Sequence, residues 1–339
     1  MRTRTTSASV AVLGAGHVGA AITHTLVLQG IAERVILHDR QRARAEGEAW
    51  DIGDTTPLLH EGTVLPTDDY RDLADSDVVV VTVGANIKAG QPRLEVLGQN
   101  ADLIRSVMAE LDNVSREAVV VIATNPVDIL TRIAIACSSR PEHQILGSGT
   151  VVDTARLRYR LAATLGVDAE DTLVHILGEH GESQFVAWSS AAIGSIPLAS
   201  FPLPPGMSLA QIQADCETAT RRRGADIHTR KGYTSYGIAA AVCRISTSIL
   251  RNEGRIFTVS ARALPEYGIG TEVALGLPCT IGRKGVARRL LLQLDAEVGL
   301  RSRRWCWRRP TAHCHSKCAV ILALDLSHNK YPCPDHCPG

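Results

Sequence analysis

The first 150 residues alternate between short apolar runs and longer segments with helical periodicity. The apolar runs span residues 10–13, 34–38, 77–84 and 118–125. The last two are almost continuously β-branched, which is typical of strands buried on both faces of a parallel sheet. Residues 17–30 and 94–111 lie between such runs and carry apolar residues at helical spacing. The alternation predicts a parallel sheet covered by helices.

Glycines mark the first predicted strand-to-helix turn with the spacing GxGxxG, at Gly14, Gly16 and Gly19. Gly14 permits a tight turn, Gly16 lets the backbone approach a pyrophosphate, and Gly19 lets the helix pack closely on the strand. The start of the helix offers amide donors and the positive end of a dipole. Val18, within the motif, is also expected to contact the ligand. Alone, the spacing is equally compatible with an ordinary glycine-rich turn.

An acidic residue closes the second predicted strand. Asp39 stands twenty residues after the last glycine of the motif. A carboxylate there would accept hydrogen bonds from an adenine-ribose diol and would repel a 2′-phosphate, which favours NAD over NADP. The neighbouring Arg40 leaves NADP open, and a helix or turn cap is the alternative role for Asp39. Since ligands bind beyond the carboxyl ends of parallel strands, Gly84 and Asn125 are expected at the reactive end of the cofactor.

Length and charge narrow the class of protein. A chain of 339 residues suits two domains, because single cores stop growing at roughly 250 to 300 residues. Lys plus Arg (36) nearly balance Asp plus Glu (35), which disfavours nucleic acid and anionic membranes as partners and favours a small molecule. No apolar run approaches the roughly 20 residues that span a bilayer, and no signal-peptide core follows the N-terminus. We therefore expect a cytoplasmic protein without a membrane partner. Four scattered cysteines suit reduced, buried thiols: Cys137, Cys216, Cys243 and Cys279.

Six segments resemble, in order, the L-lactate/L-malate dehydrogenase family. They are GAGHVG (14–19), GANIKAGQPRLEVLGQN (84–100), TNPVDIL (124–130), GSGTVVDTARLR (147–158), LGEHGES (177–183) and KGYTSYGIA (231–239). The resemblance covers about residues 8–297. It implies an α/β fold, with a Rossmann-type doubly wound parallel sheet that binds NAD over 8–147 and a second, α+β catalytic domain over 148–297. It also implies hydride transfer between NAD(H) and a small L-2-hydroxy or 2-keto acid, and self-association as a homodimer or homotetramer.

The resemblance assigns the groups that reduction of a keto acid requires. His180 in LGEHGES matches the general acid/base, and imidazole suits both directions of the reaction because its usual pKa lies near neutrality. Asp153 would orient His180 and stabilise its charged form. Arg156, three residues further along a helix, would hold the substrate carboxylate as a two-pronged pair. The alternatives are a histidine in an ordinary polar role and a surface salt bridge between residues 153 and 156.

Two further residues are expected close to the reacting carbonyl. Arg93 matches the arginine that polarises it, in a loop whose Gly90 suits closure over the ligand and exclusion of water. A solvated loop charge is the alternative for Arg93. Asn125 is expected to hydrogen-bond near the reacting oxygen, and the Asn125–Pro126 peptide is a candidate cis bond. We expect no metal at this site.

Two positions bear on the side chain of the substrate. Ile87 occupies a loop position that is usually glutamine in the lactate enzymes and arginine in the malate enzymes of the family. It offers no cation for a second carboxylate, so oxaloacetate would bury a carboxylate unpaired. Thr234 is lactate-like, whereas Ile87 and its context also resemble the branched-chain (hydroxyisocaproate) relatives. We expect an L-lactate dehydrogenase-like enzyme with an apolar side-chain pocket, and a malate dehydrogenase is the alternative.

The tail over 298–339 departs from the family pattern, which would finish in a long amphipathic helix. Residues 301–339 lack a 3.6-residue periodicity and contain five of the nine cysteines, four of the twelve histidines and four prolines. We interpret the tail as a non-native peptide from a shifted reading frame. Loss of the closing helix would leave a catalytically weak NAD-binding protein as the second functional hypothesis. Other interpretations are nucleic-acid contact through RSRRWCWRR, or a zinc-binding appendage on Cys314, Cys318, Cys333 and Cys337 with His315 or His336.

Overall fold

A nine-stranded sheet lies at the centre of the computed structural model, which describes residues 8–59, 62–85, 93–267 and 272–292. The strand order is β14-β13-β12-β6-β5-β4-β1-β2-β3. The strands from β3 to β6 run parallel, and β12 to β14 continue the sheet in antiparallel pairing. The parallel strands are β1 (Ser9–Leu13), β2 (Arg34–His38), β3 (Thr63–Thr67), β4 (Val78–Val81), β5 (Val119–Ile122) and β6 (Ile145–Gly147). The antiparallel strands are β12 (Arg255–Arg262), β13 (Ala274–Gly282) and β14 (Gly285–Arg289).

The four apolar runs predicted as strands form β1, β2, β4 and β5. β4 and β5 are buried along their whole length and pair in parallel, with Val78 opposite Val119. Both are shorter than predicted, because residues 82–84 and 123–125 leave the sheet. The Thr82 hydroxyl there donates to Leu13 O at 2.8 Å, so a side chain ties the end of β4 to the end of β1. The carboxyl ends of β1, β4 and β5 lie side by side, and the predicted cofactor residues Gly14, Gly84 and Asn125 follow these ends.

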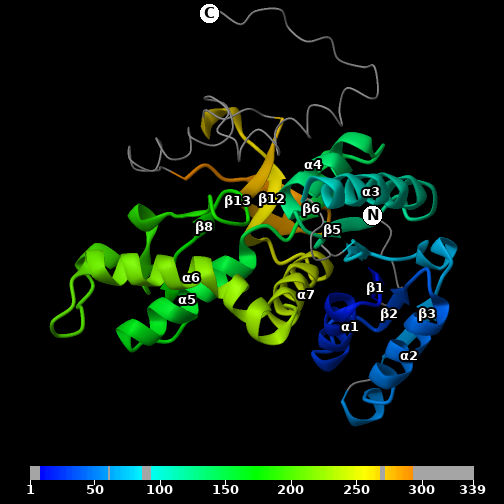
Figure 1. The fold of residues 1–339 in the computed structure, drawn as a ribbon, viewed down its shortest axis with the longest axis horizontal. Helices are drawn as coiled ribbons and strands as arrows, with labels where there is room; N and C mark the ends of the chain where they lie inside the picture. Colours follow the sequence, from blue (N-terminus) through cyan, green and yellow to red (C-terminus); the bar gives the residue numbers. More distant parts are fainter. Residues whose placement is uncertain (1–7, 60–61, 86–92, 268–271, 293–339) are drawn as a thin grey trace, which may run out of the picture.

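Helices cover both faces of the sheet, which confirms the predicted doubly wound arrangement (Figure 1). On one face, α1 (His17–Leu28) and α7 (Tyr236–Leu250) share a core that also includes α2 (Arg42–Gly53). On the other face, α3 (Arg93–Val114) and α4 (Val127–Cys137) pack together over β4 and β5. The central strands are therefore shielded from water on both sides, as their continuous apolar runs require.

A second lobe has a core of its own, formed by α5 (Val151–Leu165), α6 (Leu209–Lys231) and short strands. Figure 1 shows α5 and α6 on the opposite side of the molecule from α2 and β3. The two halves of the chain nevertheless share one sheet, because β12 pairs with β6 at Ser260 and Gly147. The short strands are β7 (Thr172–Leu173), β8 (Ile176–Leu177), β9 (Phe185–Val186), β10 (Ala192–Ile193) and β11 (Ile196–Pro197).

Short 3-10 helices join several of these elements. They are η1 (Thr56–Leu58), η2 (Tyr70–Leu73), η3 (Glu142–Gln144), η4 (Trp188–Ser190), η5 (Leu198–Ser200) and η6 (Pro265–Tyr267). Two of them, η2 and η3, come directly before β4 and β6 in the chain.

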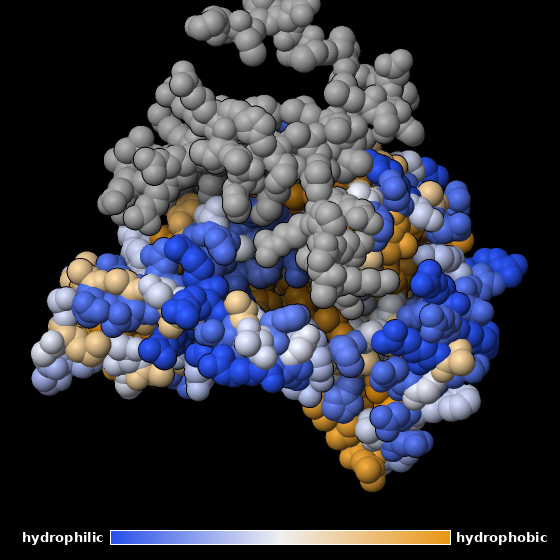
Figure 2. Space-filling model, in the orientation of Figure 1, coloured by the Kyte–Doolittle hydropathy of each residue, from blue (hydrophilic) through white to orange (hydrophobic). Residues whose placement is uncertain are grey.

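The surface and the cysteines complete the description. Figure 2 shows hydrophilic residues over much of the face that carries α6, and hydrophobic residues between the two lobes near α7. Of the helices in the described ranges, none combines the length and the apolar character needed to cross a membrane. Cys216, Cys243 and Cys279 are buried, unpaired thiols as predicted. Cys137 is also a free thiol, but the prediction of burial was wrong for it, because it lies exposed at the end of α4.

Candidate active site

The glycine-rich turn and Asp39 meet at the ends of β1 and β2. Gly14 adopts φ +104°, in the left-handed region that favours glycine. A Cβ on Gly19 would lie 1.8 Å from Gly14 O, so only glycine permits this approach of helix and turn. The Asp39 carboxylate accepts a hydrogen bond from Ala15 N–H at 2.9 Å, and Gly14 N–H donates to His38 O at 2.7 Å. The turn and the acidic residue therefore form one unit.

The start of α1 lies beside this turn. Gly16 precedes the helix, Val18 lies in its first turn, and no described side chain caps its amides. A Cβ on Gly16 would find its nearest neighbour, Arg44 Nη2, 3.8 Å away. Uncapped amides at a helix start attract an anionic group such as a pyrophosphate. Of the alternative roles for Asp39, the turn cap is also realised, since its second oxygen accepts from Gln41 N–H at 2.9 Å. Asp39 does not cap α2, whose N-cap is Gln41 and has no side-chain cap.

The loops after β4 and β5 are joined by Asn100, a residue of α3 that is only 3% exposed. Its Oδ1 accepts from Ala85 N–H at 2.7 Å, and its Nδ2 donates to Asn125 O at 3.2 Å. Gly84 directly precedes Ala85, which makes the first of these hydrogen bonds. Asn125 is exposed and forms a cis peptide bond with Pro126. Sequence reasoning missed the role of Asn100, although an asparagine on an otherwise apolar helix face was a usable signal.

His180, Asp153 and Arg156 form a continuous cluster on α5 and the loop after β8. His180 Nδ1 lies 2.6 Å from Asp153 Oδ2, and Arg156 Nη1 donates to Asp153 Oδ1 at 3.0 Å. The side chain of Asp153 is 4% exposed, compared with 20% for Arg156 and 29% for His180. Each carboxylate oxygen thus holds one cationic partner. This contact is no surface salt bridge, because the carboxylate between the two partners is buried.

The pKa values follow from that burial and pairing. Burial lowers the pKa of His180, but the hydrogen bond to Asp153 and the negative charges of Asp153 and Asp128 outweigh it, so the pKa is raised overall. Burial raises the pKa of Asp153, but His180 and Arg156 together bring it below its usual value. Both directions favour an imidazolium beside a carboxylate. Because Nδ1 faces Asp153, Nε2 is the nitrogen that can exchange a proton with a ligand.

The loop that carries His180 is anchored by groups that sequence reasoning did not identify. Gly178 and Gly276 exchange backbone hydrogen bonds of 2.9 and 2.8 Å just before the histidine. His180 N–H donates to Asp128 Oδ2 at 2.7 Å, and the Ser260 hydroxyl donates to Asp128 Oδ1. Burial raises the pKa of Asp128 to about 6, against the effect of these hydrogen bonds. A lone carboxylate at the start of an apolar helix was the signal available in the sequence.

The structure describes only some of the remaining predicted substrate residues, which are Thr234, Arg93 and Ile87. Thr234 lies half-buried between α6 and α7, next to Tyr233, whose ring stacks on the His17 ring at a centroid distance of 4.0 Å. Since His17 opens α1, this stack sets the Thr234 segment beside the glycine turn. Arg93 is the first residue of α3, but its side chain lies outside the described structure, as do Ile87 and the cysteines and histidines of the tail.

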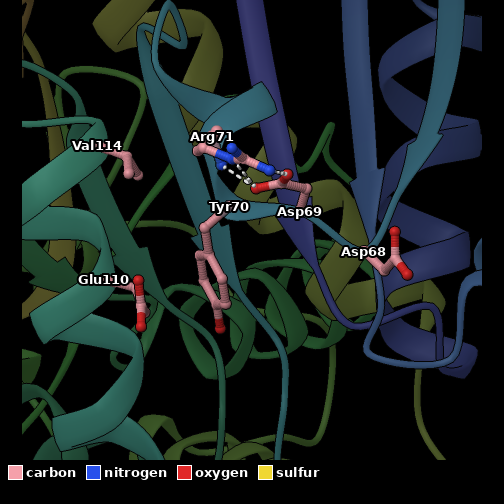
Figure 3. A pocket seen from close by; sticks show the side chains of 6 residues that line it. All are labelled: Asp68, Asp69, Tyr70, Arg71, Glu110 and Val114. Atoms are coloured by element: carbon pink, nitrogen blue, oxygen red, sulfur yellow. Dashed lines mark hydrogen bonds and ion pairs between the residues drawn. The ribbon is translucent and has the colours of Figure 1, made fainter.

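A surface hollow of about 450 Å³ is lined by the segment that follows β3 and by α3 (Figure 3). Figure 3 shows Asp69 and Arg71 in contact, and their side chains are 36% and 84% exposed. The described residues that line it include none of those predicted for cofactor or substrate; they are Asp68, Asp69, Tyr70, Arg71, Glu110 and Val114. We therefore place the candidate active site at the carboxyl ends of the parallel strands and along α5.

Two family models match this chain in sequence. Residues 8–147 match "lactate/malate dehydrogenase, NAD binding domain", and residues 150–299 match "lactate/malate dehydrogenase, alpha/beta C-terminal domain". An L-lactate dehydrogenase of Deinococcus radiodurans is 40% identical over 289 residues, which cover 85% of this chain and 92% of that protein. An L-lactate dehydrogenase of Moorella thermoacetica is 37% identical over 294 residues, which cover 85% and 91%.

Two solved structures are similar in fold and sequence. A lactate dehydrogenase from a Medee basin deep-sea metagenome library superimposes with a TM-score of 0.85 at 31% identity, covering 95% of this chain and 99% of that one. The minor L-lactate dehydrogenase of Enterococcus mundtii, in its ligand-bound form, gives a TM-score of 0.85 at 30% identity, covering 96% and 99%.

Proposed function

The chain belongs to the lactate/malate dehydrogenase family and carries its NAD-binding domain, and from this premise we propose that it acts as an L-lactate dehydrogenase-like oxidoreductase. The proposed substrate is a small apolar 2-keto or 2-hydroxy acid. The observation that carries the proposal is the buried Asp153 carboxylate, which holds His180 at 2.6 Å and Arg156 at 3.0 Å. That arrangement supplies a proton carrier and a carboxylate-binding cation side by side.

The glycine turn fits NAD, which supplies or accepts the hydride when bound. The close approach of Gly19 to Gly14 and the uncapped start of α1 suit the diphosphate, and Asp39 suits the ribose hydroxyls. Each oxygen of the Asp39 carboxylate already accepts one backbone N–H and keeps a further lone pair. We assign the cofactor to Gly14, Gly16, Val18, Gly19, Asp39, Gly84 and Asn125.

The chemistry of the substrate is assigned to the cluster on α5. His180 would donate its Nε2 proton to the keto oxygen and take the hydroxyl proton in the reverse direction, while Asp153 holds the charged imidazolium. Arg156 uses one N–H for Asp153. We assign the remaining donors of its planar fork to the substrate carboxylate.

Three more residues are assigned to the substrate. Arg93 would polarise the carbonyl, together with Asn125 near the reacting oxygen. Ile87 and Thr234 would contact the substrate side chain. An isoleucine at position 87 leaves a second carboxylate without a cation, so we propose an apolar side-chain pocket in preference to malate dehydrogenase activity.

A substrate panel tests this assignment. We expect kcat/KM with NADH to be higher for pyruvate or 2-ketoisocaproate than for oxaloacetate. The matched variant Ile87→Arg should raise kcat/KM for oxaloacetate and lower it for the apolar acids. A wild-type preference for oxaloacetate would refute the substrate assignment.

A second candidate is a catalytically weak NAD-binding protein. It is favoured by the change in composition at residue 298, because the family match ends at residue 299. We propose that the tail over 298–339 is non-native and that the closing helix of the family is missing. Tight NADH binding without NADH consumption, for all three keto acids, would support this candidate. The coding DNA tests the shifted frame: translation of another frame should give a leucine- and glutamate-rich helical sequence in place of the tail.

Assembly and location complete the proposal. We expect a homodimer or homotetramer in the cytoplasm, with no nucleic-acid or membrane partner. Light scattering coupled to size exclusion measures the assembly, and a monomer at micromolar concentration would contradict the expectation.

A further inference from the structure

Asp128 places a second carboxylate at the loop of His180, on a different helix from Asp153. It lies in the first turn of α4 and is 5% exposed. Its Oδ2 accepts the His180 backbone N–H at 2.7 Å, and its Oδ1 accepts the hydroxyl of Ser260 from β12. One buried side chain therefore connects the His180 loop, a helix and a sheet strand.

His180 depends on such side-chain contacts, because it lies outside β8 and β9. The backbone pairing of Gly178 with Gly276 ends two residues before it, and Gly181 follows it with φ +151°. Asp153 holds the imidazole ring, and Asp128 holds the backbone of the same residue. The two carboxylates thus restrain the histidine at both ends.

The charge of Asp128 acts on the same histidine. The charged groups around Asp128 are the imidazole of His180, which favours the carboxylate form, and Glu179, which opposes it. Reciprocally, the charge of Asp128 adds to that of Asp153 in raising the pKa of His180, against the effect of Arg156.

We propose that Asp128 is a positioning residue for the reaction: its buried carboxylate fixes the backbone of His180 by accepting from the amide N–H, while Ser260 holds the carboxylate in place. The inference rests on the proposed function for what His180 does. The anchoring itself is measurable without turnover.

Asp128→Asn is the direct test, since it keeps the shape and removes the charge. Its amide nitrogen must face a donor, either the His180 N–H or the Ser260 hydroxyl. We expect kcat for pyruvate reduction to fall by on the order of 10²-fold, the loss typical of a slightly misplaced reacting group. The KM for pyruvate should change little, because Asp153 still holds Arg156. The high-pH limb of the rate profile should move to lower pH.

Asp112→Asn is the matched control. Asp112 also accepts from a backbone N–H, Ser139 at 2.6 Å, and from a serine hydroxyl, Ser138 at 2.7 Å. It lies at the end of α3, away from the proposed site. Its variant should keep the wild-type kcat and pH profile.

NMR titration of histidine-labelled protein separates this inference from the proposed function. His180→Asn identifies the signal, and Asp128→Asn should move its midpoint to lower pH. If the wild type reduces no keto acid but the midpoint still moves, the proposed function fails and the positioning role stands. If the midpoint and kcat both equal those of the wild type, the positioning role is overturned.

Ser260→Ala provides the test if Asp128→Asn does not fold. It removes one of the two donors to Asp128 and leaves the charge in place. A loss of about tenfold in kcat at an unchanged KM is expected for one lost buried hydrogen bond. An unchanged kcat in this variant would overturn the role of Asp128 as an anchor.

Discussion

Replacement of Asp153 by asparagine is the sharpest test of how the cluster on α5 works. The substitution keeps the shape of the side chain and removes one negative charge next to His180 Nδ1, 2.6 Å from the carboxylate oxygen. Because the Asp153 side chain is only 4% exposed, water screens little of that charge. The variant therefore removes the charge, and its amide nitrogen replaces one of the two oxygens that accept from His180 and Arg156.

The size of the expected fall in kcat follows from two lost interactions, the charge-assisted hydrogen bond and the attraction between the two charges. A charge-assisted hydrogen bond contributes about 1 to 1.5 kcal/mol more than a neutral one. Two opposite charges about 4 Å apart attract by about 4 kcal/mol at an effective dielectric constant near 20. These losses overlap, so we expect the imidazolium to be destabilised by roughly 3 to 5 kcal/mol. At about 1.4 kcal/mol for each factor of ten, kcat falls by roughly 10² to 10⁴-fold.

The assay is NADH oxidation with pyruvate at saturating cofactor, measured across pH. Asp153→Asn should lower kcat by that factor and move the high-pH limb to lower pH, because the pKa of His180 is raised by Asp153 in the wild type. Asp112→Asn is the control, since Asp112 also pairs with an arginine, Arg140 Nε at 3.0 Å. A kcat for Asp153→Asn within about twofold of the wild type would refute the reasoning.

Three further variants test other parts of the account. Arg156→Lys should raise the KM for pyruvate and lower kcat/KM by roughly 10 to 100-fold, because an ammonium cannot form the two-pronged pair while contacting Asp153; steady-state kinetics with an unchanged KM would argue against it. Asp39→Ser should weaken NADH binding and reduce the preference for NADH over NADPH, because the carboxylate no longer accepts from the ribose hydroxyls or repels a 2′-phosphate. Fluorescence titration measures both affinities, and an unaltered preference would exclude a contact between Asp39 and the adenine ribose. The pKa of Asp128 in the folded protein, about 6, exceeds its usual value of 3.8, so the stability from its protonation is present at low pH and is lost as pH rises through about 6. The free energy of unfolding of the wild type relative to Asp128→Asn should therefore fall by about 2 kcal/mol between pH 4 and pH 7, and a difference independent of pH would contradict the buried carboxylate.

Local patterns in the sequence predicted the elements that carry the site. Continuous runs of β-branched residues predicted β4 and β5, because a strand that is buried on both faces is apolar at every position. The glycine spacing predicted a tight turn with a closely packed helix, and in the structure Gly19 leaves no room for a Cβ beside Gly14 O. The three-residue spacing of Asp153 and Arg156 predicted that they share one helix face, where they pair. Each of these inferences depends on residues close together in the chain.

Contacts between distant segments could not be predicted in this way. The antiparallel strands β12 to β14 join the parallel sheet through the pairing of Ser260 with Gly147, and no local pattern encodes that register. Asn100 and Asp128 were missed for the same reason. Their partners, Asn125 for the first and His180 for the second, come from other loops, so a single polar residue on an apolar helix gave only a weak signal.

In the proposed reaction, His180 carries the proton that accompanies hydride transfer between NAD(H) and a small 2-keto acid. The most direct measurement compares the wild type with His180→Asn for NADH oxidation by pyruvate and 2-ketoisocaproate, with NADH affinity measured on the same samples. We expect His180→Asn to lose roughly 10² to 10⁴-fold in kcat with the NADH affinity unchanged. Equal turnover by both proteins would contradict it.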